Sequence, residues 1–318
     1  MKLTLFAASI LTLTLGLCTP KVNAAPTKTP KNFTEWCEQK ASLPEETRHT
    51  VEVLLKVAET ENCNQANQKL TQLTELDLIL KEISDLRPLS SLTNIKRLYL
   101  GYNKVTDISP LSSLTNLTGL FLGINQISDI TPLSNLTNLK SLILFANQIS
   151  DIRPLSNLTN LTEISLGLNQ ISDIQPLSKL NSLTFLSIHN NNISNVEPLS
   201  NLTNLSKLIL PKNQINDIQP LSNLTNLTEL SLGKNQINDI QPLANLTDLE
   251  KLELSYNQIS DIRPLSNLTN LTELNLRQNQ IRNFQPISKL RLLQYLYIQD
   301  NSVKLNKCPV QSVFTCEF

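Results

Sequence analysis

Apolar and polar residues alternate along this chain in a unit that returns every 22 residues. Within one unit, Leu230 and Leu232 alternate with Glu229, Ser231 and Gly233. Alternation with a period of two predicts a short strand with one face buried and the other in solvent. A polar segment that contains a proline follows each strand. The pattern therefore predicts a strand, a turn and a short helical segment in every unit.

The units keep their register along most of the chain. An eleventh, earlier unit runs from Leu73 through Leu76, Leu78 and Ile83 and has Lys81 at the position where ten later units have asparagine. One unit buries about seven apolar side chains, worth roughly 14 kcal/mol, against an ordering cost of about 1.5 kcal/mol for each residue. A single unit therefore cannot fold alone, and the units must stack so that their strands pair in parallel. The asparagine column consists of Asn103, Asn125, Asn147, Asn169, Asn191, Asn213, Asn235, Asn257, Asn279 and Asn301.

The asparagines are predicted to point into the interior, where the chain turns away from each strand. An asparagine amide has two donors and an acceptor on a short stem, so it can bridge the backbones of adjacent coils. Lys81 fits this scheme because the first coil lies at the end of the stack, where a long side chain can reach water. In seven units an aspartate three residues before the proline is expected to accept backbone N–H bonds: Asp107, Asp129, Asp151, Asp173, Asp217, Asp239 and Asp261. The proline itself suits the first turn of a short helix on the outer side.

The first 24 residues are predicted to be a signal peptide that is removed before Ala25. Lys2 precedes an apolar run of 15 residues, from Leu3 to Leu17, and Ala24 is a small residue before the expected cleavage point. The run is shorter than the roughly 20 residues that a membrane-spanning helix needs, so no membrane insertion is expected after cleavage. A lipoprotein signal that uses Cys18 is the alternative, although the bulky Leu17 precedes it.

Residues 25–70 are predicted to form a helical N-terminal cap. Ser42 and Glu45 have the spacing of a capping box, and apolar residues follow at helical spacing. The single tryptophan, Trp36, is expected to pack beneath this helix. Four cysteines remain after cleavage, and their nearness in sequence favours two disulfides over four free thiols. The expected pairs are Cys37 with Cys63, across the cap helix, and Cys308 with Cys316, which closes a small C-terminal cap at residues 304–318.

Residues 71–303, with the pattern LxxLTNLxxLxLxxNQIxDIxPLxxL, resemble the internalin-type leucine-rich-repeat proteins of bacteria. The resemblance implies an α/β solenoid that is curved, with a concave parallel sheet of about 11 strands, convex turns and short 3-10 helices, and a concave face that grips another protein. The immunoglobulin-like module and cell-wall signals of internalins have no counterpart in this sequence. Only the binding architecture is therefore carried over.

Aromatic and aliphatic residues are concentrated at concave positions near the N-terminal end of the repeats. A contiguous apolar surface of this kind commonly marks a binding site; the preference of strands for aromatic residues and self-association are the alternatives. Tyr256, Tyr295 and Tyr297 occupy similar positions farther along, whereas Phe284 replaces a core isoleucine. The predicted ligand-binding residues are Tyr99, Tyr102, Phe121, Ile124, Ile143, Phe145, Leu168 and Phe185.

Composition and charge narrow the classes of function. The formal net charge is zero, so no nucleic acid or anionic membrane is expected as a partner. No nucleophile elbow, phosphate loop or metal-ligand pattern occurs, and neither His49 nor His189 stands beside a matched acid or nucleophile; we expect no catalytic residues, metal or cofactor. Mixed charges on the rest of the concave face are expected to be solvated. They are Lys207, Lys212, Glu229, Lys234, Lys251, Glu253, Glu273 and Arg277.

The sequence therefore predicts an exported, non-enzymatic binding module, either secreted, periplasmic or on the cell surface, whose concave face recognises a protein or a glycan. Two alternatives remain open. One is an intracellular phosphatase-type regulatory subunit, because similar 22-residue repeats occur in such a protein. The other is a structural or self-associating envelope protein. Cell fractionation separates the first alternative from export, and sedimentation of the mature chain tests the second.

Overall fold

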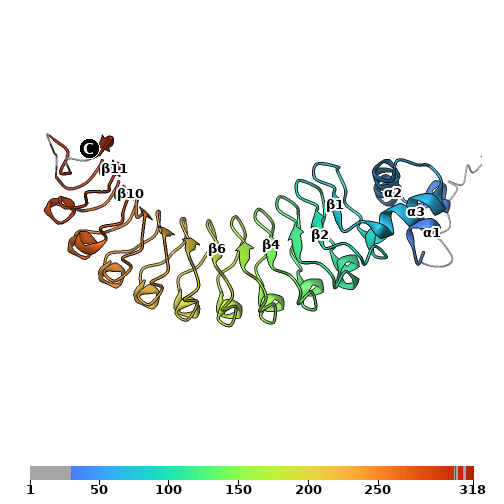
Figure 1. The fold of residues 1–318 in the computed structure, drawn as a ribbon, viewed down its shortest axis with the longest axis horizontal. Coiled ribbons are helices and arrows are strands. Elements are labelled where there is room, and N and C mark those ends of the chain that lie inside the picture. Colours follow the sequence, from blue (N-terminus) through green and yellow to red (C-terminus); the bar gives the residue numbers. More distant parts are fainter. Residues whose placement is uncertain (1–29, 304, 306, 311–312) are drawn as a thin grey trace, which may run out of the picture.

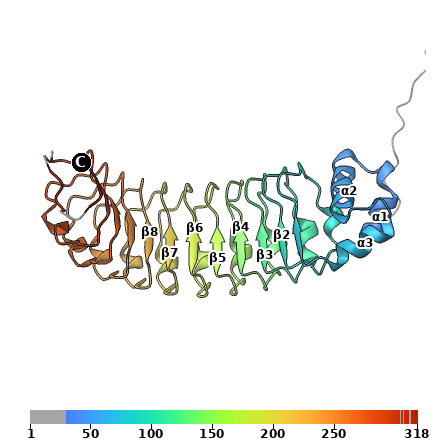
Figure 2. The same cartoon turned by 45° about the horizontal axis from the view of Figure 1, so that its top comes forward.

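The computed structural model describes residues 30–303, 305, 307–310 and 313–318, so the predicted signal peptide and its alternative at Cys18 lie outside the described residues. The repeats stack into a curved solenoid with helices at its N-terminal end (Figure 1). The strands follow one another side by side in the order of the chain (Figure 2). This arrangement confirms the predicted leucine-rich-repeat solenoid with a parallel sheet.

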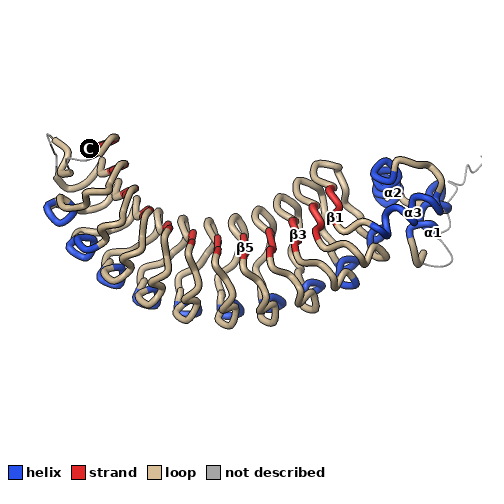
Figure 3. Tube along the Cα trace, viewed as in Figure 1, coloured by secondary structure: helices blue, strands red, loops and turns tan. Residues whose placement is uncertain are grey.

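The strands line the concave side of the solenoid and the short helices line the convex side (Figure 3). The sheet has twelve strands in the described part of the chain, each paired in parallel with its sequence neighbours. The strands are β1 (Glu75–Asp77), β2 (Arg97–Tyr99), β3 (Gly119–Phe121), β4 (Ser141–Ile143), β5 (Glu163–Ser165), β6 (Phe185–Ser187), β7 (Lys207–Ile209), β8 (Glu229–Ser231), β9 (Lys251–Glu253), β10 (Glu273–Asn275), β11 (Tyr295–Tyr297) and β12 (Thr315–Glu317).

Each convex segment from η2 to η11 is a 3-10 helix of three or five residues with its proline in the first turn, as predicted. Asp129 Oδ1 accepts a hydrogen bond of 2.8 Å from the Thr131 N–H, so the aspartate orders the turn just before Pro132. The 3-10 helices of the repeats are η2 (Arg87–Leu89), η3 (Ser109–Ser113), η4 (Thr131–Leu133), η5 (Arg153–Leu155), η6 (Gln175–Leu177), η7 (Glu197–Leu199), η8 (Gln219–Leu221), η9 (Gln241–Leu243), η10 (Arg263–Asn267) and η11 (Gln285–Ile287).

The asparagine side chains lie inside the solenoid and connect successive coils. Asn169 Nδ2 donates to Leu144 O in the preceding coil and to Leu166 O in its own coil, both at 3.0 Å. Its Oδ1 accepts from the Ile149 N–H at 3.0 Å. One amide therefore satisfies buried backbone groups of two coils, which water cannot reach. At the N-terminal end Asn103 Oδ1 accepts from the N–H of exposed Lys81, so the first coil needs no asparagine of its own.

Three α-helices cover the N-terminal end of the core: α1 (Phe33–Glu38), α2 (Glu45–Ala58) and α3 (Cys63–Gln72), with the 3-10 turn η1 (Lys40–Ser42) between the first two. Phe33, Leu54 and Leu70 are fully buried, and the Trp36 side chain is only 3% exposed. The open end of a stacked core would otherwise expose apolar surface to water. The helices remove that surface and end the solenoid on one side.

A polar network joins the cap to the first coil. Asp85 in the first coil accepts a hydrogen bond of 2.5 Å from Thr47 Oγ1 of α2, and Arg87 Nη2 lies 2.6 Å from Asp85 Oδ2. The Arg87 guanidinium also lies 5.7 Å from the centre of the Trp36 ring. Burial alone raises the pKa of Asp85, but the hydrogen bonds from Arg87 and Thr47 outweigh it, so the pKa lies below its usual value.

The predicted capping box is wrong. Ser42 ends the turn η1, where its Oγ donates to Gln39 O at 2.9 Å, and α2 begins only at Glu45 with Pro44 in the N-cap position. A residue before proline is pushed out of the helical region by contact with the proline ring. Leu43 accordingly has an extended backbone, with φ of −74° and ψ of 151°. The helix therefore starts after the proline rather than at Ser42.

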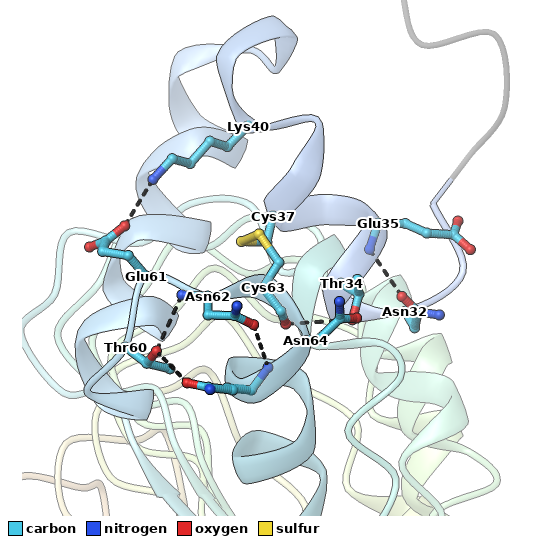
Figure 4. The surroundings of a disulfide bond; sticks show 11 residues. Asn32, Thr34, Glu35, Cys37, Lys40, Thr60, Glu61, Asn62, Cys63 and Asn64 are labelled. Atoms are coloured by element: carbon cyan, nitrogen blue, oxygen red, sulfur yellow. Dashed lines mark hydrogen bonds and ion pairs between the residues drawn. A yellow bond between two sulfur atoms is a disulfide. The ribbon is translucent and has the colours of Figure 1, made fainter.

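Both predicted disulfides are present. Cys37 in α1 is bonded to Cys63 at the start of α3, so the bond spans the whole of α2 (Figure 4). Close by, the Asn32 and Asn62 side chains accept hydrogen bonds from the N–H groups of Glu35 and Gln65, which caps α1 and α3. These are the helix caps that the sequence reading missed.

The C-terminal segment adds one strand more than the eleven predicted. Cys316, bonded to Cys308, lies opposite Leu296 in the register between β11 and β12. Backbone bonds from Phe314 N and Thr315 N to Gln294 O repeat the connection that joins every earlier pair of coils. The tail therefore continues the sheet by one strand, and the disulfide ties β12 to the segment that precedes it.

Candidate ligand-binding surface on the concave sheet

The predicted ligand-binding residues lie in parallel rows on the concave side, because equivalent positions of successive coils stand side by side. Tyr99, Phe121 and Ile143 are direct partners in the strand register of β2, β3 and β4, and we call them the strand row. The Phe145 ring lies beside Phe121, with centroids 6.2 Å apart and planes at 64°. Such an edge-to-face contact is a favourable arrangement of two aromatic rings.

None of these side chains is buried in the core. Tyr102 and Leu168 are 45% and 43% exposed, and the other predicted residues are half-buried. Phe185 is the one that the structure does not bring into the cluster: it begins β6, outside the strand row, and its ring lies 5.9 Å from Lys207 Nζ. The concave cluster therefore extends over the N-terminal half of the sheet without Phe185.

Glycines let the aromatic rings lie against the sheet. A Cβ on Gly101 would stand 1.8 Å from Cε1 of Phe121, and one on Gly123 would stand 2.5 Å from Cε1 of Phe145. Any other residue at either position would displace the ring that now covers it. The rings of Phe121 and Phe145 consequently lie against the sheet and are half-buried rather than fully exposed to solvent.

Gly101→Ala is expected to lower the free energy of unfolding by roughly 1–3 kcal/mol, the usual cost of forcing extra atoms into a packed contact. Gly119→Ala is the matched control, because its Cβ would meet only Cγ of Arg97, at an ordinary 3.5 Å. Urea unfolding of both variants measures the difference. Equal stability of the two variants would show that the ring of Phe121 does not rest on Gly101.

A second row of apolar residues, exposed or half-buried, follows the first five strands at the turn into the asparagine position. These residues have left-handed backbones, with φ between 54° and 57°, a conformation that is costly for bulky residues and especially for β-branched isoleucine. Leu80, which is 70% exposed, belongs to this row and was not among the predicted residues. A comparison of equivalent positions in all repeats, including the first, would have found it. The turn row consists of Leu80, Tyr102, Ile124, Ala146 and Leu168.

Leu80→Asn is expected to raise the free energy of unfolding by up to about 1 kcal/mol, because asparagine tolerates a left-handed backbone better than leucine does. Little apolar burial is lost, since Leu80 is 70% exposed. Leu292→Asn is the control: Leu292 is 55% exposed but has no positive φ, so its stability should not rise. Urea unfolding of both variants decides. A lower stability for Leu80→Asn would show that the left-handed backbone at Leu80 is not strained.

The strand row borders a hollow of about 300 Å³ above Gly119. Tyr99, Phe121 and Ile143 supply its apolar lining, and Arg97 and Lys140 are the only charged residues in it. The absence of a side chain at Gly119 creates the space. Arg97 Nη1 lies 3.4 Å from Glu75 Oε2, so the hollow combines an apolar floor with a border whose one unpaired charge among the described residues is Lys140.

A larger hollow, of about 610 Å³, lies farther along the concave face between β6 and β10. Its charges are largely paired within the protein: Lys207 Nζ lies 2.7 Å from Glu229 Oε2, and Lys251 Nζ lies 3.9 Å from Glu273 Oε2. His189 also lines this hollow, and burial together with nearby Lys212 lowers its pKa. Two lysines and three glutamates line this hollow, so its net charge is opposite in sign to that of the N-terminal hollow.

Two further charged residues of the concave face are also held by neighbours. Lys234 Nζ lies 4.8 Å from the centre of the Tyr256 ring, and Glu253 accepts hydrogen bonds from the Ser255 N–H and the Asn275 amide. Among the described residues, no group of three or more His, Cys, Asp or Glu side chains could hold a metal ion. No helix in the same residues is long and apolar enough to cross a membrane.

Known proteins share both the repeat and the curved sheet. A family model of leucine-rich repeats, in units of two copies, matches residues 71–113, 93–135, 137–179, 159–201, 203–245, 225–267 and 247–289. The structure of the internalin InlF from Listeria monocytogenes is similar at 38% identity and a TM-score of 0.77, over 80% of this chain and 75% of that one. The chain belongs to the internalin-like leucine-rich-repeat proteins.

Two further Listeria monocytogenes structures resemble this internalin-like chain. Internalin C2 is 36% identical over 62% of this chain and 88% of its own, with a TM-score of 0.59. The functional domain of InlJ covers 90% of this chain and 67% of its own with a TM-score of 0.68, but at 22% identity it supports the fold alone. No curated protein sequence matches the chain. The fold is that of a protein-binding module.

Proposed function

We propose that this internalin-like chain is an exported, non-enzymatic protein that binds another protein through the N-terminal half of its concave face. The observation that carries the proposal is the cluster formed by the strand row, the turn row and Phe145, which places contiguous apolar side chains on an open sheet. Exposed apolar surface of this extent on a soluble protein commonly serves binding. Apolar side chains of a partner protein fit this surface better than the hydroxyl groups of a glycan do.

The two disulfides support the exported location. Disulfides persist in oxidising compartments and are reduced in the cytosol, so the bonds at Cys37–Cys63 and Cys308–Cys316 favour export over the intracellular regulatory subunit. The predicted signal peptide at residues 1–24 points the same way. Export is tested by fractionating cells that express the chain, and recovery of the chain with reduced cysteines from the cytosol would contradict the proposal.

Phe121→Glu together with Phe145→Glu is expected to weaken capture of the partner by at least about 30-fold, since a central aromatic contact commonly contributes about 2 kcal/mol or more. The chain without residues 1–24 serves as bait for envelope and culture fractions. Leu292→Glu, on an exposed leucine outside the concave sheet, is the control and should capture as the unchanged chain does. Undiminished capture by the double variant would place the binding surface elsewhere.

Self-association is the competing explanation of the same apolar cluster. Sedimentation of the chain alone separates the two. A concentration-dependent dimer that Phe121→Glu with Phe145→Glu abolishes would assign the cluster to a second copy rather than to a different protein.

A further inference from the structure

We infer that the partner presents an amphipathic segment with one apolar edge and one acidic edge, which lies along the solenoid across the first five coils. The inference rests on the proposed function and adds the chemistry of the ligand. The apolar edge would lie on the turn row, and the acidic edge would face Lys96 and Lys140. Two independent features of the concave face support this orientation.

The first feature is the composition of the turn row. All eleven coils have a left-handed residue at this position, but only the first five consecutive coils keep apolar residues there, apart from Tyr256 farther along. The fold does not require apolar side chains at this place, because Asn190, Lys212, Gln278 and Asp300 have the same backbone conformation. Strain that the fold could have avoided points to a use for the side chains.

The turn row is long enough for a segment of defined length. Neighbouring strands lie about 4.8 Å apart, so the row from Leu80 to Leu168 extends over roughly 19 Å. This corresponds to about six residues of extended chain or about thirteen residues of helix. The segment is expected to cross the strands rather than pair with them, since β2 to β5 are paired with a strand on both sides and β1 alone in these coils has an edge without a strand partner.

The second feature is the charge at the opposite ends of the same strands. Lys96 and Lys140 precede β2 and β4 and are exposed. Among the described residues, neither lies within 4.0 Å of a carboxylate, whereas Lys207 and Lys251 in the C-terminal half are paired with glutamates. In the nearby hollow above Gly119, Arg97 is paired with Glu75 at 3.4 Å, which leaves Lys140 as the one unpaired charged residue of that lining among the described residues. An acidic edge on the partner would complement this border.

The strip between the two features has the width of a single segment. Tyr102 follows Arg97 by five residues, and its backbone turns out of the strand direction, so the basic border and the turn row lie at most about 16 Å apart. A helix with its side chains is about 10–12 Å in diameter. One segment can therefore touch both borders at once, and an apolar side chain from its middle would reach the hollow above Gly119.

The test is selection of binders from a phage library of random 16-residue peptides against the immobilised chain. We expect the enriched peptides to have a net negative charge and several apolar residues. Lys96→Glu with Lys140→Glu should reverse the selected charge to positive. Lys179→Glu with Lys289→Glu makes the same change in charge at exposed positions just after the convex helices η6 and η11, and should leave the selected peptides acidic.

Leu80→Asn with Leu168→Asn tests the apolar edge. We expect the affinity for the selected acidic peptides to fall by about 30-fold while the thermal unfolding temperature does not fall, which separates loss of binding from loss of fold. Enriched peptides that are neutral or basic, a selected charge unaffected by Lys96→Glu with Lys140→Glu, or no enrichment at all would overturn the inference.

The two proposals fail in different ways. If Phe121→Glu with Phe145→Glu abolishes capture of the natural partner but the charge reversal leaves the selected peptides unchanged, only the chemistry of the segment is wrong. If the double phenylalanine variant captures the partner as before, the binding surface itself is misplaced, and the inference falls with it.

Discussion

Asn169→Ala is expected to lower the free energy of unfolding by about 3 kcal/mol. The substitution leaves the Ile149 N–H without its acceptor and removes hydrogen bonds to Leu144 O and Leu166 O, all in the buried interior. An unpaired buried donor costs about 1–3 kcal/mol, and each lost hydrogen bond costs about 1 kcal/mol more. The carbonyls of Leu144 and Leu166 each retain a second asparagine donor, which limits the loss.

Asn160→Ala is the matched control, because the same residue type stands nine positions earlier in the same coil. Asn160 Nδ2 makes a single hydrogen bond of 2.9 Å to Thr137 O, and the bond is exposed to solvent. We expect a loss below about 1 kcal/mol there, since water can replace the donor. Urea unfolding of the two variants measures both values. Losses of equal size would mean that the interior asparagine is not required to bridge the coils.

Replacement of Cys37 and Cys63 by alanine is expected to lower stability by about 3.5 kcal/mol. The bond closes a loop with a sequence separation of 26 residues. A cross-link of this span lowers the conformational entropy of the unfolded state, which corresponds to about 3.5 kcal/mol of stability. The cap should be affected first, because α1 and α3 are joined through this bond. Without the cap, the apolar end of the first coil is opened to water, so the loss extends into the repeats.

Thermal unfolding followed by circular dichroism measures this effect. The pair Cys308 and Cys316 provides the comparison, because its separation is only 8 residues and the same entropy relation gives about 2.5 kcal/mol. A reducing agent should lower the unfolding temperature of the unchanged chain. It should have no effect on a variant in which Cys37, Cys63, Cys308 and Cys316 are all replaced by alanine. An unchanged unfolding temperature after loss of Cys37 and Cys63 would show that the cap holds without its disulfide.

The period of 22 residues was enough to predict the solenoid, because each position of the unit has one environment in every coil. Leu230 and Leu232 could be assigned to the core, and the proline to the convex turn, from alternation alone. The two ends of the solenoid were predicted less well, because each occurs once and cannot be compared with equivalent positions in other units. Pro44 moved the start of α2 away from Ser42, and the segment that contains β12 has no full repeat pattern.

The concave cluster was predictable only as a list of positions. Sequence spacing places Tyr99, Phe121 and Ile143 in one row, but it does not show that the rings lie over Gly101 and Gly123. The left-handed backbone conformation of the turn row could not be predicted from the sequence either. The left-handed turn at Leu80 follows from the coil geometry and not from the residue, since leucine does not favour that conformation.

Crosslinking tests the central claim, the location of the binding surface, most directly. A photoreactive benzoylphenylalanine replaces Tyr102, on the concave side and 45% exposed, or Lys179, exposed on the convex side. Each variant is mixed with envelope and culture fractions and irradiated, and adducts are detected by their mass on a denaturing gel. We expect a discrete adduct with another protein from position 102 and none from position 179. No adduct from position 102, or an equal adduct from position 179, would contradict a partner on the N-terminal concave face.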